Sequence, residues 1–127
     1  MVVGFRWTAT ARRLLPLDLL CLLNRYGEIV GETVRTERGI PIPFLGDGVA
    51  ALFGLEVETR EANRQALSAA IKVQHRLQAL SDRLAQELGS AADLVIHLHT
   101  GLADVGQSGD YATHTLAAVG DTIDVTR

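Results

Sequence analysis

The sequence has little cysteine, little lysine and no long apolar run, and each scarcity excludes something. Cysteine occurs once, as Cys21, so the chain cannot close an internal disulfide, and the cytosol is the default compartment. No apolar run reaches the roughly 18 residues of a membrane span, and the N-terminus lacks the pattern of a signal peptide. Of the 12 basic residues, only Lys72 is lysine. We therefore expect a cytoplasmic protein without direct membrane insertion.

The composition is otherwise that of an ordinary globular protein, with 47% hydrophobic and 21% charged residues. A net charge of −3 argues against a nucleic-acid partner, because nucleic-acid-binding domains usually present a basic face. A chain of 127 residues can bury one core but not two, so we expect a single domain over residues 1–127.

The apolar pattern predicts two long helices and several short strands. Leucine at helical spacing covers residues 16–34, and alanine and leucine recur at intervals of three and four from Thr59 to Leu88. Short apolar runs predict strands at residues 2–5, on both sides of the turn 46–48, on both sides of Gly101 as a hairpin or a strand pair, and at 113–119. The last segment predicts the start of a helix, with Asp121 or Thr122 as its N-cap.

Two prolines and the order of the elements predict the architecture. Pro41 and Pro43 lie two residues apart, so their missing N–H groups fall on the same side of a strand, which must then lie at a sheet edge. The alternation of strands and helices favours an α+β fold, specifically a ferredoxin-like sandwich with helices on one face of a mostly antiparallel sheet. In that topology the second strand is an edge strand.

The segment "FLGDGVAALFG" at 44–54 predicts a hairpin, because its central residues tolerate the positive φ of a tight turn. Asp47 at the hairpin tip has two interpretations. It is either a turn residue or a carboxylate placed to bind a metal ion.

Three blocks of the sequence carry a family resemblance. "LLNRYGEIVGETVRTERGIPIPFLGDGVAALFG", "LHTG" and "AVGDTIDV" occur in that order, and the intervals between Gly101, Gly106 and Gly120 also match. With these blocks the chain resembles the catalytic domain of class III adenylate/guanylate cyclases over almost its whole length. It stops before the family's final strands, so an incomplete cyclase-homology domain is expected.

The resemblance implies a homodimer or heterodimer with ATP or GTP bound between subunits. In the family, two aspartates on adjacent strands hold two Mg²⁺ or Mn²⁺ ions, which activate the ribose 3′-hydroxyl and stabilise the leaving pyrophosphate. The partner subunit supplies a lysine and an aspartate or threonine for the purine, an asparagine for the ribose and an arginine for the transition state.

Only one of the two metal acids has a match here. Asp47 stands at the second metal position, whereas residues 1–17 contain no acid at all. The motif "MVVGF" puts Met1 in the place of the first acid, and counting back from Pro16 puts Val3 there instead. Either alignment loses that ligand.

The nucleotide-contacting positions are also poorly matched. Pro43 replaces the purine-reading lysine, Ala117 the second purine contact and Asp124 the ribose asparagine. Arg127 follows Asp124 by three positions instead of the family's four, so it is only a candidate for the catalytic arginine. The resemblance leaves Gly46, Gly48 and Asp124 as nucleotide-binding candidates, and "GDTIDV" as an anion-binding turn or an ordinary helix start.

Several other residues have both a functional and a structural interpretation. His97 and His99 alternate on a strand and, with His114, would make a transition-metal site, but ordinary packing is the commoner role. His75 is expected to be solvated and Cys21 to be a small buried hydrophobe. Residues 62–88 are either a coiled-coil partner or a core-facing helix, of which the second is favoured.

The sequence thus favours a degenerate class III cyclase domain, inactive alone, with a regulatory or dimerisation role in cyclic-nucleotide signalling. The alternative is an adenylate or guanylate cyclase subunit that is active only with a complementing chain. A third hypothesis is nucleotide sensing without chemistry.

Overall fold

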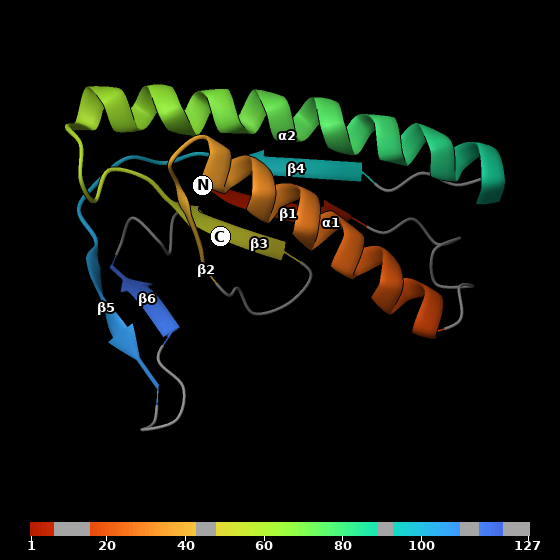
Figure 1. Cartoon of the computed structure of the whole chain (residues 1–127), viewed down its shortest axis with the longest axis horizontal. Coiled ribbons are helices and arrows are strands. Elements are labelled where there is room, and N and C mark those ends of the chain that lie inside the picture. Colours follow the sequence, from red (N-terminus) through yellow and green to blue (C-terminus); the bar gives the residue numbers. More distant parts are fainter. Residues whose placement is uncertain (7–15, 43–47, 89–92, 110–114, 121–127) are drawn as a thin grey trace.

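A computed structural model of the chain describes residues 1–6, 16–42, 48–88, 93–109 and 115–120 (Figure 1). Within these ranges the order of elements is strand, helix, two strands, helix and three strands. They are β1 (Val2–Arg6), α1 (Pro16–Thr36), β2 (Ile40–Ile42), β3 (Gly48–Leu52), α2 (Thr59–Leu88), β4 (Asp93–His97), β5 (Asp104–Ser108) and β6 (Thr115–Val119). Both predicted helices are confirmed. The expected helix start at Asp121 or Thr122 lies outside the described residues.

Four of the strands form one antiparallel sheet in the order β2-β3-β1-β4. With the elements β1, α1, β2, β3, α2 and β4, this is the predicted ferredoxin-like topology. β2 lies at the sheet edge and pairs only with β3, Pro41 standing opposite Ala51. The proline prediction is confirmed, because a proline has no N–H to offer a second neighbour.

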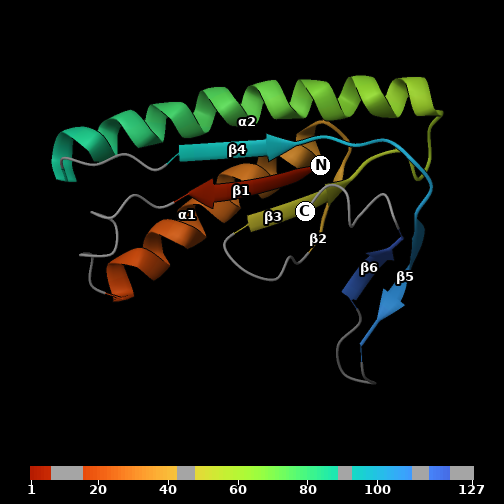
Figure 2. The ribbon, with the colours of Figure 1, turned by 180° about the vertical axis from the view of Figure 1, so that it is seen from behind.

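Both helices cover one face of this sheet, while the other face is turned away from them (Figures 1 and 2). The core between the layers includes Tyr26, Val30 and Val34 of α1 with Val73 and Leu77 of α2, all of them fully buried. Alternate residues of β3 face the helices, which is the period-two pattern of a strand. The prediction that residues 62–88 form a core-facing helix is confirmed, because Val73 and Leu77 of α2 lie in this core.

The remaining strands β5 and β6 form a separate antiparallel pair, which lies beside the four-stranded sheet (Figures 1 and 2). The strands predicted on both sides of Gly101 therefore exist, but they do not pair as a hairpin: β4 joins β1 and β5 joins β6. Ala118 of β6 packs against Ile42 and Ala50, on the sheet face opposite the helices. This contact attaches the small sheet to the large one.

The hydrogen bonds at the end of α1 set the direction of the chain into β2. Gly39 N–H donates to Val34 O at 2.8 Å and Arg38 N–H to Arg35 O at 3.0 Å, the pattern of a Schellman motif. Arg38 takes the left-handed conformation with φ 66°, where glycine is usual. No helix within the described ranges is long and apolar enough to cross a membrane.

Candidate functional site

The candidate site is the region where β1 lies beside the start of β3. Gly4 pairs with Gly48 and Val3 with Val49. Two residues beyond the Val3–Val49 pair, Met1 N donates to Ala51 O at 3.0 Å, and Ala51 N–H donates to Met1 O at 2.8 Å. The register between the two strands is therefore fixed over their whole contact.

Most residues predicted for the site lie outside the described ranges, including the metal candidate at the hairpin tip. These residues are Pro43, Gly46, Asp47, Asp124 and Arg127. Gly48 is described, as the first residue of β3. Ala117 lies on β6, half-buried and opposite Gly106, and its methyl group offers no hydrogen bond to a purine.

The register bears on the two alignments of the missing acid. Val3 stands opposite Val49, two residues along the chain from Asp47, whereas Met1 stands opposite Ala51, four residues from Asp47. Since a strand rises about 3.3 Å per residue, position 3 lies roughly 7 Å nearer than position 1 to the residue opposite the start of β3.

The described residues of β1 and the start of β3 do not supply the ligands of a two-cation site. Both alternative positions for the first acid are apolar, and β1 carries no carboxylate. Within the described residues, no group of three or more histidine, cysteine, aspartate or glutamate side chains could hold a metal ion. Hard divalent cations prefer several oxygen ligands, and Asp47 alone does not supply them.

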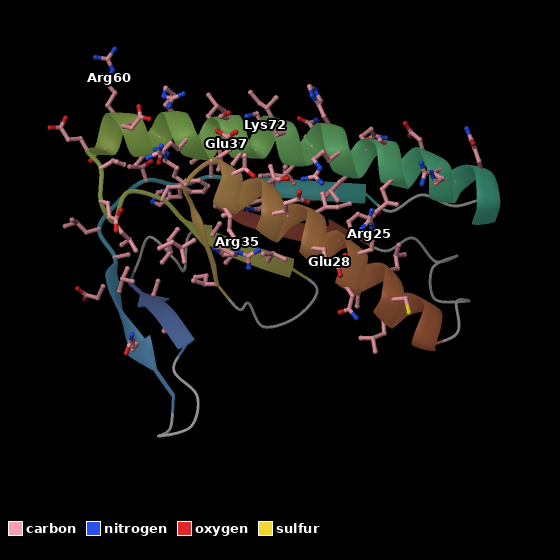
Figure 3. The ribbon with its side chains drawn as sticks, in the orientation of Figure 1. Arg25, Glu28, Arg35, Glu37, Arg60 and Lys72 are labelled. Carbon is pink, nitrogen blue, oxygen red and sulfur yellow. The ribbon has the colours of Figure 1, made fainter. Side chains whose placement is uncertain are left out.

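Lys72, the only lysine, lies on α2 and forms an ion pair with Glu37 at the end of α1 (Figure 3). The hydrogen bond from Lys72 lowers the pKa of the Glu37 carboxyl, and a smaller contribution comes from Ser68. Glu37 has a side chain that is only 12% exposed, so its charge is held close to the protein. The lysine therefore holds the two helices together, far in sequence from the hairpin.

A second polar link joins the same helices one turn away. Arg76 donates to Thr33 Oγ1 at 2.7 Å and to a Glu32 carboxylate oxygen at 2.9 Å. The hydrogen bond from Arg76 lowers the pKa of Glu32. Thr33 is buried and its hydroxyl also donates to Ile29 O. No local sequence pattern indicates these links, because their partners are more than thirty residues apart.

The histidines do not form a cluster among the residues that are described. His97 ends β4 and His99 follows two residues later, and both side chains are exposed. His114, the third candidate ligand, lies outside the described residues. His75 is exposed on α2, which confirms the prediction that it is solvated.

The prediction for Cys21 was wrong, because its side chain is exposed. Cys21 precedes Arg25 by four residues and Glu28 by seven, so it shares their solvent-facing side of α1. Leu20 beside it is 54% exposed as well. The leucine-rich run is thus not buried throughout, and among the side chains of α1 that the structure describes, Tyr26 is the first that is fully buried.

Comparison with known proteins places the fold. No model of a known protein family matches the chain. Adenylate cyclase 1 of Rhizobium meliloti is 30% identical over 112 residues, which is 87% of this chain and 16% of that protein. The chain therefore spans a small part of this curated relative.

Solved structures of cyclases are similar over nearly the whole chain. The adenylyl cyclase CyaB from P. aeruginosa superimposes with a TM-score of 0.85 at 21% identity, over 98% of this chain and 66% of that one. The dimeric guanylyl cyclase domain of the RhoGC fusion protein from Blastocladiella emersonii gives a TM-score of 0.77 at 15% identity, over 98% and 68%. At these identities the likeness establishes the fold.

Proposed function

We propose, from the premise that the chain has the fold of the class III adenylyl and guanylyl cyclase catalytic domain, that it is a degenerate cyclase domain. Its role is regulatory or dimerising within cyclic-nucleotide signalling, and it does not turn over nucleotide alone. The observation that carries this proposal is the apolar residue at position 3, opposite Val49, where the fold would need its first metal-binding acid.

The energetic argument rests on how many charged groups are missing together. Single groups aimed at a transition state contribute about 3 kcal/mol each when removed. Here Val3 or Met1 replaces the metal ligand, and Pro43 replaces the purine-reading lysine. All of these replacements are apolar. Since the effects act on the same charged substrate, turnover by this chain alone is expected to be negligible.

Lys72 does not compensate for Pro43. It lies on α2, and its ammonium group is engaged by Glu37 of α1. Moving it to the hairpin would require breaking the ion pair and unwinding the middle of a 30-residue helix. The position of Lys72 therefore supports the proposal that this domain has lost nucleotide recognition by lysine.

The expected partner is a second cyclase domain, either an identical chain or a different one. The solved guanylyl cyclase domain from Blastocladiella emersonii is described as a non-canonical dimer. A domain that keeps the fold without the catalytic groups would retain a surface for such pairing. ATP and GTP remain candidate ligands under this proposal, with Asp47 as a single candidate ligand for Mg²⁺ or Mn²⁺.

Turnover and binding assays on the purified chain test the proposal. Cyclic AMP and cyclic GMP formation is measured with ATP or GTP, each with Mg²⁺ or Mn²⁺, and an active class III cyclase serves as the positive control. We expect no product above background. Clear turnover that disappears in Asp47→Ala would overturn the proposal. Calorimetry with the same nucleotides then separates a nucleotide sensor from a domain that binds none.

The retained "GDG" hairpin favours one second candidate, a cyclase subunit completed by another chain. In that case Asp47 still contributes to a shared site, and the missing groups come from the partner. Mixing the chain with a cyclase domain that carries the acid, lysine, asparagine and arginine set tests this. Activity that requires both chains and is lost with Asp47→Ala supports it, whereas equal activity of the Asp47→Ala mixture contradicts it.

A further inference from the structure

The outward side of α2 carries two exposed aliphatic side chains. Leu67 is 55% exposed and Ile71 is 47% exposed. Ile71 is two residues from Ala69 and two from Val73, both fully buried, and two residues are roughly half a helical turn. Ile71 therefore points away from the core, on a face that no described element covers.

The polar residues around this pair are arranged symmetrically about Ile71. Arg64 and Gln78 are each seven residues from Ile71, and Arg60 and Asp82 are each eleven residues from it. Seven and eleven residues are close to two and three turns, so these four side chains share the face of Ile71. All of them are exposed. We call Arg60, Arg64, Leu67, Ile71, Gln78 and Asp82 the outer stripe.

The two ends of the outer stripe carry opposite charges that no described residue neutralises. Among the described residues, no ion pair includes Arg60 or Asp82. They lie roughly 33 Å apart along the helix, so they cannot reach one another. Arg60 extends from the first turn of α2 away from α1 (Figure 3). The Asp82 carboxylate accepts a hydrogen bond from Gln78 at 2.9 Å, but neither Asp82 nor Arg60 has an oppositely charged partner among the described residues, so each can pair with an opposite charge on another molecule.

The flank of α2 that faces α1 is already occupied. Lys72 and Arg76 lie there and bind the acidic residues of α1. The outer stripe is therefore a separate surface, and a partner bound to it would leave the contacts between α1 and α2 intact.

We propose that the outer stripe binds the outer stripe of a second copy of this chain, with the two α2 helices antiparallel and a two-fold axis at Ile71. In this arrangement Ile71 meets Ile71 and each Arg60 meets the Asp82 of the other copy. Arg64 lies opposite Gln78 and Leu67 opposite His75. A closed two-fold contact requires such a self-complementary surface. Two helices side by side bury a small interface, so we expect dissociation constants on the order of micromolar or weaker.

Sedimentation velocity over a concentration series tests the contact with Ile71→Glu. Two glutamates would then face each other at the axis, and we expect self-association to weaken about tenfold or more. Leu55→Glu is the matched control, because Leu55 is 48% exposed but lies outside α2. We expect this control to associate like the unmodified chain. Unchanged association of Ile71→Glu, or a chain that is monomeric at every concentration, overturns the proposal.

A charge exchange tests the register independently of the apolar centre. Arg60→Asp and Asp82→Arg should each weaken association, because each places like charges opposite one another twice. The double variant Arg60→Asp with Asp82→Arg restores both ion pairs in reversed order, so association should return. Both positions are solvent-exposed, and circular dichroism checks that each of the three variants is folded. A double variant that associates no better than the single ones overturns the antiparallel register.

Discussion

Gly39 packs against the ring of Phe53 so closely that no side chain fits between them. A Cβ atom built on Gly39 would stand 2.5 Å from Cε1 of Phe53 and 2.8 Å from Cγ1 of Val34, closer than real Cβ atoms approach other atoms. The chain can therefore pass from α1 into β2 at this point only because the residue has no side chain. The contact therefore joins the turn after α1 to Phe53, the residue that directly follows β3.

Gly39→Ala is expected to destabilise the protein by about 1–3 kcal/mol, because the methyl group must displace an aromatic ring and a buried valine. Urea unfolding followed by circular dichroism measures the change. Gly27→Ala is the matched control, since a Cβ on Gly27 meets nothing within 4 Å. In the middle of α1 this control should raise stability by roughly 0.5–1 kcal/mol. Equal stability of the two variants would contradict the close contact.

Arg38→Gly is expected to stabilise the protein by about 0.5–1 kcal/mol. Arg38 holds the left-handed conformation at the end of α1, which glycine adopts without a steric cost. Part of the gain is offset by the greater freedom of glycine in the unfolded chain. Arg38→Ala removes the same charge but keeps the strain, so it separates the two effects. If the alanine variant is as stable as the glycine variant, the backbone explanation fails.

The Lys72–Glu37 ion pair makes stability depend on acid. The hydrogen bond from Lys72 lowers the pKa of Glu37 below its ordinary value of 4.5. A group with a lowered folded pKa contributes stability above its unfolded pKa and loses it as the pH falls through the folded pKa. Lys72→Met should therefore cost up to about 1 kcal/mol at pH 7, as for a surface ion pair whose lysine is half-exposed. The cost should shrink progressively below the ordinary pKa of Glu37.

Denaturant unfolding of both proteins from neutral to acidic pH measures this difference. Arg83→Met is the control, because Arg83 is exposed on the same helix and no ion pair of the described residues includes it. Its effect should not change with pH. A Lys72→Met cost that stays constant down to strongly acidic pH would show that packing, not charge, links the helices.

How much could be predicted from the sequence depended on the range over which each signal acts. Local periodicity was enough for α2, where buried Ala69, Val73 and Leu77 recur at intervals of four. Pro41 was enough to place β2 at the edge, because its missing N–H is a property of one residue. The links between the helices depend on pairs such as Arg76 and Thr33, 43 residues apart, which no local pattern encodes.

The candidate site divides in the same way. The absence of an acid in residues 1–17 is visible in the sequence, but its alignment was ambiguous between Met1 and Val3. The strand register places Val3 opposite Val49, which is information that only the paired strands hold. Cys21 was misplaced because a run of leucines hides which side of the helix faces the core.

Val3→Asp is expected to bind divalent cations more tightly than the unmodified chain, in which Asp47 is the single candidate ligand. The new carboxylate would lie opposite Val49, on the strand beside the one that follows Asp47. Two carboxylates on adjacent strands can share hard cations, which then stabilise the folded state. With Mn²⁺ at about 100 times its dissociation constant, the gain is about 2.7 kcal/mol. Thermal unfolding with and without Mn²⁺ measures this gain.

Two control variants should not respond to Mn²⁺. Val3→Asn introduces a side chain of the same size as aspartate without its charge, and Val3→Asp with Asp47→Ala lacks the second ligand. A response of all three variants, or of none while Val3→Asp is folded, contradicts position 3 as the vacant ligand position.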